Sequence, residues 1–177
     1  MNRKFRNATL VVLTLILITT GILYYKPVVV EALSNWIGVY PVHYEGHTIG
    51  ETFTVSVNIS AEGLAGFEYK LRWNNTLLKV TNITITPPWS GYFIGKNETT
   101  DLGDGRSQHF LGVTSLPVTA WTGNTTVCTY TFQVIYKPAP GEPDGYSLLD
   151  IVDSKFSDAD GNPIAHDEYD GEYIIRS

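Results

Sequence analysis

The sequence has few of the residues that disulfide-bonded, zinc-binding or nucleic-acid-binding proteins need. A single cysteine, Cys128, stands among 177 residues, which excludes an intramolecular disulfide framework and a cysteine-rich zinc module. Charged residues account for only 17% of the chain, whereas aromatic residues are abundant, and this balance favours β-sheet over a helical bundle. The net charge of −6 argues against nucleic acid as a partner, because its phosphates would be repelled.

Catalytic motifs are also missing. The four histidines are scattered, and no H-E-x-x-H, G-x-S-x-G or phosphate-binding glycine loop occurs. Acidic residues gather after residue 138, and a glycosidase needs only two carboxylates, but nothing in the pattern marks one of them as buried. We therefore predict that the protein is not an enzyme and has no cofactor, apart from a candidate calcium site.

The first 32 residues have the pattern of an export segment. Residues 8–25 are uncharged, and as a hydrophobic helix they would rise about 27 Å, close to the thickness of a bilayer's hydrocarbon core. Basic residues before position 7 would hold that flank in the cytoplasm. The segment is therefore either a membrane anchor or a signal peptide cleaved after Ala32. In both cases residues 33–177 form an extracellular domain, anchored at the cell surface or secreted.

The exported part is rich in glycosylation sequons. Five of the eight asparagines after residue 32 begin an N-x-S/T motif, more than the serine and threonine content would give by chance. The alternative is that asparagine and threonine are both common in exposed turns and on strand faces. Given export, we favour a glycosylated surface protein. The candidate asparagines are Asn58, Asn74, Asn82, Asn97 and Asn124.

Alternation of apolar and polar residues predicts an all-β domain. In residues 66–73, for example, Phe67, Tyr69 and Leu71 share one face while charged residues occupy the other. In residues 77–85 the alternation changes parity after Val80, which indicates a β-bulge. The expected strands are 37–44, 52–59, 66–73, 77–85, 108–114, 126–136, 146–156 and 172–175.

Turns rich in glycine, proline and asparagine join these short strands, a pattern typical of a single β-sandwich. Residues 87–105 and 116–124 are expected to be loops. The predicted core includes Phe67, Tyr69, Leu71, Phe132 and Val134, and Cys128 is expected to pack among apolar residues as a small hydrophobic side chain.

Five segments in order along the chain share a further pattern: residues 50–60, 64–74, 77–84, 158–164 and 170–171. Together they resemble a cohesin domain, most closely the cohesin-like domains of archaeal surface proteins. The resemblance covers roughly residues 37–176, with a poor match over 90–125. It implies a jelly-roll sandwich of about nine strands, related to carbohydrate-binding modules, with a non-catalytic binding role. Classical cohesins hold the dockerin module of an enzyme, and the dockerin brings its own calcium.

Three aromatic residues in the expected loops are candidates for binding. Trp121, Trp89 and Tyr92 could stack on sugar rings or anchor a protein partner. Loop aromatics also cover the ends of sandwich cores, and for Trp89 we favour that role. Trp121 departs from the family's pattern, which has small residues in this loop.

The acidic segment Asp158, Asp160 and Asn162 supplies the hard oxygen ligands that suit calcium. It does not match the spacing of an EF-hand loop, and an ordinary turn between two strands is the simpler interpretation.

Two functions remain open at this point. The first is a cohesin-like binding module at the cell surface that engages a dockerin-like protein partner or a polysaccharide. The second is a structural subunit of a surface filament, which would self-assemble by adding residues 33–44 as a strand to a neighbour's sheet. The same residues also suit the first strand of their own domain, and we favour that interpretation.

Overall fold

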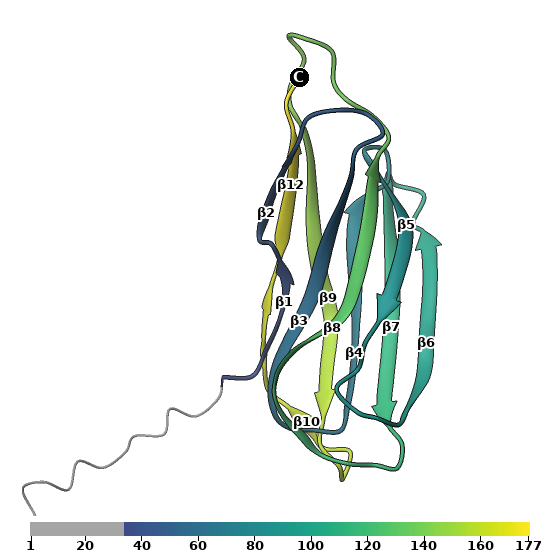
Figure 1. Cartoon of the computed structure of the whole chain (residues 1–177), viewed down its shortest axis with the longest axis vertical. Coiled ribbons are helices and arrows are strands. Elements are labelled where there is room, and N and C mark those ends of the chain that lie inside the picture. The colour runs from purple at the N-terminus through teal and green to yellow at the C-terminus, as the bar shows by residue number, and fades with distance from the viewer. Residues whose placement is uncertain (1–33) are drawn as a thin grey trace, which may run out of the picture. The chain divides into compact units, whose positions relative to one another are not determined.

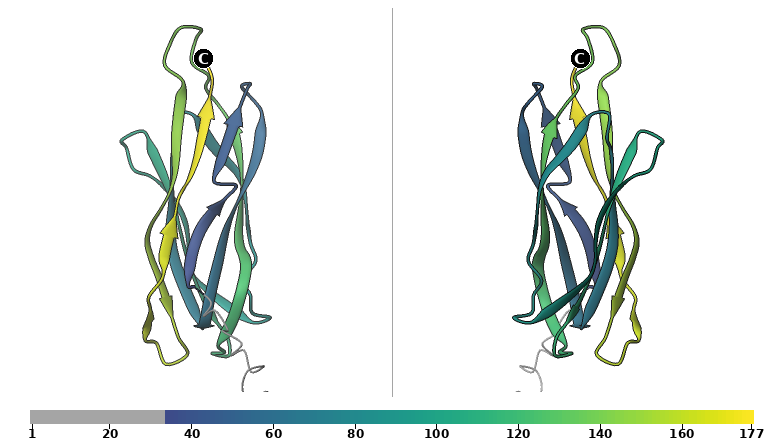
Figure 2. Two further views of the ribbon diagram at one scale, coloured as in Figure 1. Left: turned by 90° about the vertical axis from the view of Figure 1, so that its left-hand side faces the viewer. Right: turned by 90° about the vertical axis from the view of Figure 1, so that its right-hand side faces the viewer.

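The computed structural model describes residues 34–177, which form two β-sheets packed face to face (Figure 1). The hydrophobic helix predicted for residues 8–25 lies outside the described residues. Within residues 34–177 no helix has the length and apolar character to cross a membrane. The side views show the two layers of the sandwich (Figure 2).

The strands are divided between a five-stranded sheet, ordered β11-β1-β3-β8-β5, and a seven-stranded sheet, ordered β2-β12-β9-β4-β7-β6 with β10 paired to β9. The chain changes sheet between β3 and β4, between β4 and β5, between β5 and β6, between β7 and β8 and between β8 and β9, so residues distant in sequence become neighbours, whereas β6 and β7 form a hairpin within the seven-stranded sheet. The strands are β1 (Trp36–Tyr40), β2 (His43–Gly46), β3 (Thr52–Leu64), β4 (Gly66–Asn74), β5 (Leu78–Ile85), β6 (Tyr92–Asp101), β7 (Arg106–Ser115), β8 (Trp121–Val134), β9 (Gly145–Ser157), β10 (Pro163–Ile164), β11 (Asp167–Tyr169) and β12 (Gly171–Ile175).

The first predicted strand, residues 37–44, is divided between the two sheets. β1 pairs with β3 in the five-stranded sheet, whereas β2 pairs in parallel with β12 in the seven-stranded sheet. The segment is therefore part of its own domain, and donating it to a neighbour would first require breaking both pairings. This division, together with the short strands β10 and β11, raises the strand number above the expected nine.

The core lies between the sheets and is built from alternate residues of the long strands. All five residues predicted for it are buried. The predicted bulge is confirmed, since the pairing of β5 with β8 shifts between Val80 and Asn82. Cys128 is buried as expected, and burial raises the pKa of its thiol, so it packs as a protonated, unreactive side chain.

The prediction of a loop over residues 87–105 is wrong for residues 92–101, which form β6. β6 pairs with β7 along the edge of the seven-stranded sheet, and nearly all of its side chains are exposed. An edge strand that is exposed on both faces has no alternation of apolar and polar residues, so the alternation used to predict strands does not reveal it. Trp121 and Tyr92 are likewise not in loops, because they open β8 and β6.

Replacing Phe132 with Ala should destabilise the domain by about 3–5 kcal/mol, since a fully buried aromatic ring would leave a cavity. The ring packs against Phe53 and Trp73, with centroids 5.6 and 5.5 Å away. Chemical denaturation of residues 33–177 measures the change. Thr131→Ala, on the outer face of the same strand, is the control and should cost less than about 1 kcal/mol. Equal effects of the two changes would contradict this packing.

Candidate binding surfaces

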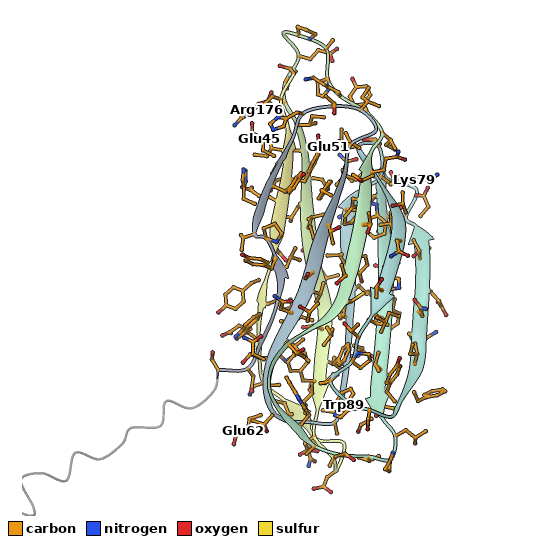
Figure 3. The ribbon with its side chains drawn as sticks, in the orientation of Figure 1. Glu45, Glu51, Glu62, Lys79, Trp89 and Arg176 are labelled. Carbon is orange, nitrogen blue, oxygen red and sulfur yellow. The ribbon has the colours of Figure 1, made fainter. Side chains whose placement is uncertain are left out.

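The aromatic residues singled out in the sequence gather at one end of the sandwich. Trp89 is only 8% exposed and stacks on Phe67, with ring centroids 6.0 Å apart, so it covers the end of the core. It lies at the opposite end from Arg176 (Figure 3). Trp121 packs against the same core from β8, and both indoles line a hollow of about 250 Å³ between residues 88–91 and 116–121. Tyr92 is 42% exposed and lies outside this lining.

The Trp121 indole is packed too closely to be a free surface anchor. A Cβ atom placed on Gly123 would lie 2.9 Å from the indole ring, so the ring rests directly on that glycine. The side chain is half-buried and contacts the hydrophobic core. Trp121 therefore has a structural role whether or not a ligand enters the hollow.

We expect Trp121→Ala to lower the free energy of unfolding by about 1–3 kcal/mol, because it removes ring contacts with the core. Tyr92→Ala, at an exposed edge position, should change it by less than about 0.5 kcal/mol. Thermal melts of the two variants compare them. An unchanged melting temperature for Trp121→Ala would show instead that the indole serves only as a surface anchor.

A second surface, which we call the basic face, is the outer side of β9, β4, β7 and β6. Residues that are opposite in register point to the same side, so the charged residues of these strands gather there. Five of the eight basic residues after residue 33 are on it, with four of the seventeen acidic ones. The rest of this acidic domain thus holds only three bases. The basic residues of the face are Lys70, Arg72, Lys96, Arg106 and Lys155.

The basic face contains a groove of about 520 Å³. Gly112 lies in register between Glu68 on β4 and Lys96 on β6, and its missing side chain opens the surface at that point. Phe93 and the aliphatic chains of Lys96 and Lys155 line the groove. The groove therefore combines apolar walls with two ammonium groups and the carboxylate of Glu68, which pairs with Lys155. Such a lining suits a partner that presents carboxylates beside apolar side chains and can exchange with the Glu68 pair.

Contacts on this face hold the lysines in place. Lys155 Nζ is 2.5 Å from Glu68 Oε1, and Lys70 Nζ is 2.7 Å from Asp153 Oδ2. The Lys70 and Lys96 ammonium groups lie 5.5 and 5.9 Å from the centre of the Phe110 ring, within cation–π range. Exposed pairs of this kind add little stability, so their main effect is to fix where the charges lie.

A buried polar network joins the two sheets beneath the basic face. The Tyr130 hydroxyl lies 3.0 Å from the Tyr69 hydroxyl and 2.7 Å from His109 Nδ1. His109 Nε2 lies 2.9 Å from Asn97 Oδ1 on the edge strand. Because Nε2 faces an acceptor, it carries the proton of the neutral ring, and Tyr130 donates to Nδ1. Burial lowers the pKa of His109 to about 4, so the ring stays neutral at pH 7.

The free energy of unfolding should fall by about 1–2 kcal/mol between pH 7 and pH 5, because of His109. The unfolded chain binds a proton at this histidine near pH 6.5, whereas the folded protein does so only near pH 4. The stabilisation that the neutral His109 ring gives the folded protein is therefore complete above pH 6.5, and it is lost as the pH falls toward 4. Denaturation at several pH values measures it. His109→Gln should flatten this slope, while the exposed His47→Gln should keep it; an equal slope in both variants would contradict the assignment.

The acidic segment at residues 158–162 forms a turn closed by its own hydrogen bonds. Asp158 Oδ1 accepts from the backbone N–H groups of Asp160 and Asn162, at 2.9 and 2.8 Å, and Oδ2 accepts from Asn162 Nδ2 at 3.0 Å. These bonds, led by the one from the Asn162 side chain, lower the pKa of Asp158. Within residues 34–177 no three His, Cys, Asp or Glu residues are arranged to hold a metal ion. The geometry is that of an ordinary turn, and a calcium site here stays an untested prediction.

Solved structures show which fold this is. The chain is similar to a non-cellulosomal cohesin from the archaeon Archaeoglobus fulgidus, with 16% identity over 81% of this chain and 92% of that one, and a TM-score of 0.61. The chain has the fold of a cohesin domain. The same fold occurs in the sixth cohesin of scaffoldin B from Acetivibrio cellulolyticus, solved with a dockerin (14% identity, 81% and 99% covered, TM-score 0.59). It occurs again in a type I cohesin–dockerin complex from Clostridium thermocellum, with 15% identity over 82% of this chain and 97% of that one, and a TM-score of 0.57.

No model of a known protein family matches the sequence, and no curated protein matches it. The likeness therefore concerns the cohesin fold alone, at identities of 14–16% for these three structures.

Proposed function

We propose that the domain is a non-catalytic module at the cell surface that binds a dockerin-like protein partner through the basic face. The observation that carries the proposal is the gathering of five of the domain's eight basic residues, with Phe93 and Phe110, on one sheet face. Two solved structures with the same fold are complexes with dockerins, which supports a protein partner. Complementary charge would speed encounter and select partners with acidic surfaces.

The location outside the cytoplasm is part of the proposal. The basic, then hydrophobic pattern of residues 1–32 supports export, by either a cleaved signal or an anchor through residues 8–25. The sequons after residue 32 add support, since glycosylation of this kind is confined to exported domains.

A polysaccharide at the hollow between Trp89 and Trp121 is the second candidate. The Trp89 Nε1–H group is buried and has no hydrogen-bond acceptor among residues 34–177. A buried donor without an acceptor is costly, and a ligand hydroxyl would accept from it only after the ring moves toward the hollow, which both indoles line. Such a ligand would bind at the end of the sandwich and leave the basic face free.

Titration calorimetry of residues 33–177 against a panel of purified dockerin modules tests the main proposal. The double change Lys96→Glu and Lys155→Glu should weaken binding at least tenfold, about 1.4 kcal/mol, and the affinity of the unchanged domain should fall with salt. Lys79→Glu is the matched control, because Lys79 lies on β5 of the other sheet (Figure 3) and should leave the affinity unchanged.

Two results would overturn the proposal. One is the same affinity for a dockerin in the Lys96→Glu/Lys155→Glu double variant as in the Lys79→Glu control, which would place the partner elsewhere. The other is no binding to any dockerin together with binding to a polysaccharide that Trp121→Ala abolishes and the lysine changes leave intact. That result would establish the second candidate in its place.

A further inference from the structure

A hollow lies on the outer face of the five-stranded sheet. The basic face is on the other sheet, on the opposite side of the sandwich. Gly38 on β1 is directly opposite Asn58 on β3 and Tyr169 on β11. A Cβ atom placed on Gly38 would lie 3.1 Å from Tyr169 Cβ and 3.6 Å from the Trp36 ring, so both side chains approach the glycine closely and form walls around it. The resulting hollow measures about 290 Å³.

The walls of the hollow are mainly aromatic. Trp36 and Tyr40 stand two residues before and after Gly38, so all three point to the same face. Tyr169 completes the wall, with its ring edge-on to Trp36 at 6.2 Å between centroids. Tyr40 and Tyr169 are 64% and 53% exposed, although rings of this size are stabilised by burial. Such walls suit the apolar C–H face of a pyranose ring.

Asn58 is the amide side chain in this lining, and it begins the sequon Asn58-Ile59-Ser60. Its Oδ1 accepts a hydrogen bond from Thr126 Oγ1 at 2.7 Å. That bond turns the amide oxygen toward β8, and the amide nitrogen has no partner within residues 34–177. The nitrogen is the atom to which an N-linked glycan is attached, so the attachment point is part of the hollow itself.

We propose that Asn58 carries an N-linked glycan whose first sugar packs into the hollow formed by Trp36, Gly38, Tyr40 and Tyr169. The inference rests on the export that is part of the proposed function. In the transfer, the Asn58 amide nitrogen bonds to C1 of a lipid-diphosphate-linked oligosaccharide. The bond from C1 to the phosphate oxygen breaks, the lipid diphosphate leaves with the electron pair, and a base of the transferase takes the amide proton.

The order of events follows from burial. The sequon serine, Ser60, is only 3% exposed in the folded domain, and the sequon is paired on both sides by β1 and β8. A transferase that reads the serine hydroxyl therefore acts before β3 is paired. The sugar is then in place when β1 and β11 close around it.

The test uses the full-length protein purified from the cells that make it. Glycopeptide mass spectrometry should find a glycan on Asn58. Asn58→Gln should lose that mass and increase the quenching of tryptophan fluorescence by acrylamide, because Trp36 is uncovered. Ser60→Ala removes the sequon but keeps Asn58 and its bond to Thr126, so it should give the same result if Asn58→Gln folds poorly.

Asn82→Gln is the matched control, on the same outer face at β5 and away from the hollow. It should lose its own glycan without changing the quenching. An unmodified Asn58 alongside glycans at other sequons would overturn this inference and leave export standing. A glycosylated Asn58 whose loss leaves the quenching unchanged would also overturn it. A chain found inside the cell with no sequon modified would contradict the proposed export as well.

Discussion

The Tyr130 hydroxyl is the point on which the alignment of the two sheets depends. It is buried between them, where an unpaired hydroxyl would be costly, and its partners come from the opposite sheet. Tyr69 on β4 and His109 on β7 meet it only if β8 keeps its register. A shift of one residue would turn Tyr130 to the outside and leave both partners unpaired. The hydrophobic core makes the sheets pack, and this network fixes how they pack.

With the interior fixed, the two outer faces are free to differ. The seven-stranded sheet presents lysines, arginines and phenylalanines around a glycine-lined groove. The five-stranded sheet presents threonine, serine and asparagine, with an aromatic hollow at Gly38. A glycan on the second face would keep it from other macromolecules and leave the first for a partner. One side of the sandwich would thus bind the partner, while the opposite side carries the glycan.

The sequence predicted the elements whose two faces differ. In strands such as β3 and β4, successive side chains alternate between the core and the outer face, so apolar and polar residues alternate in the sequence. The sequence did not predict β6, because an exposed edge strand has no buried side and therefore no alternation of apolar and polar residues. The candidate surfaces could not be predicted for another reason. Lys155 and Glu68 meet across 87 positions, and Gly38 meets Tyr169 through a parallel pairing. Such contacts depend on strand order, which alternation does not encode.

The parallel pairing of β2 with β12 determines how the domain carries mechanical load. β2 follows β1 at the start of the described chain, and β12 ends two residues before the C-terminus. Tension between the N-terminal side of β1 and the C-terminal side of β12 pulls two parallel pairs, β1 with β11 and β2 with β12, in opposite directions along their length. The bonds between His43–Gly46 and Glu172–Ile175 are then strained together rather than one after another. A tether at one end and a load at the other would act on the domain in shear, the direction in which a ladder of hydrogen bonds shares the force.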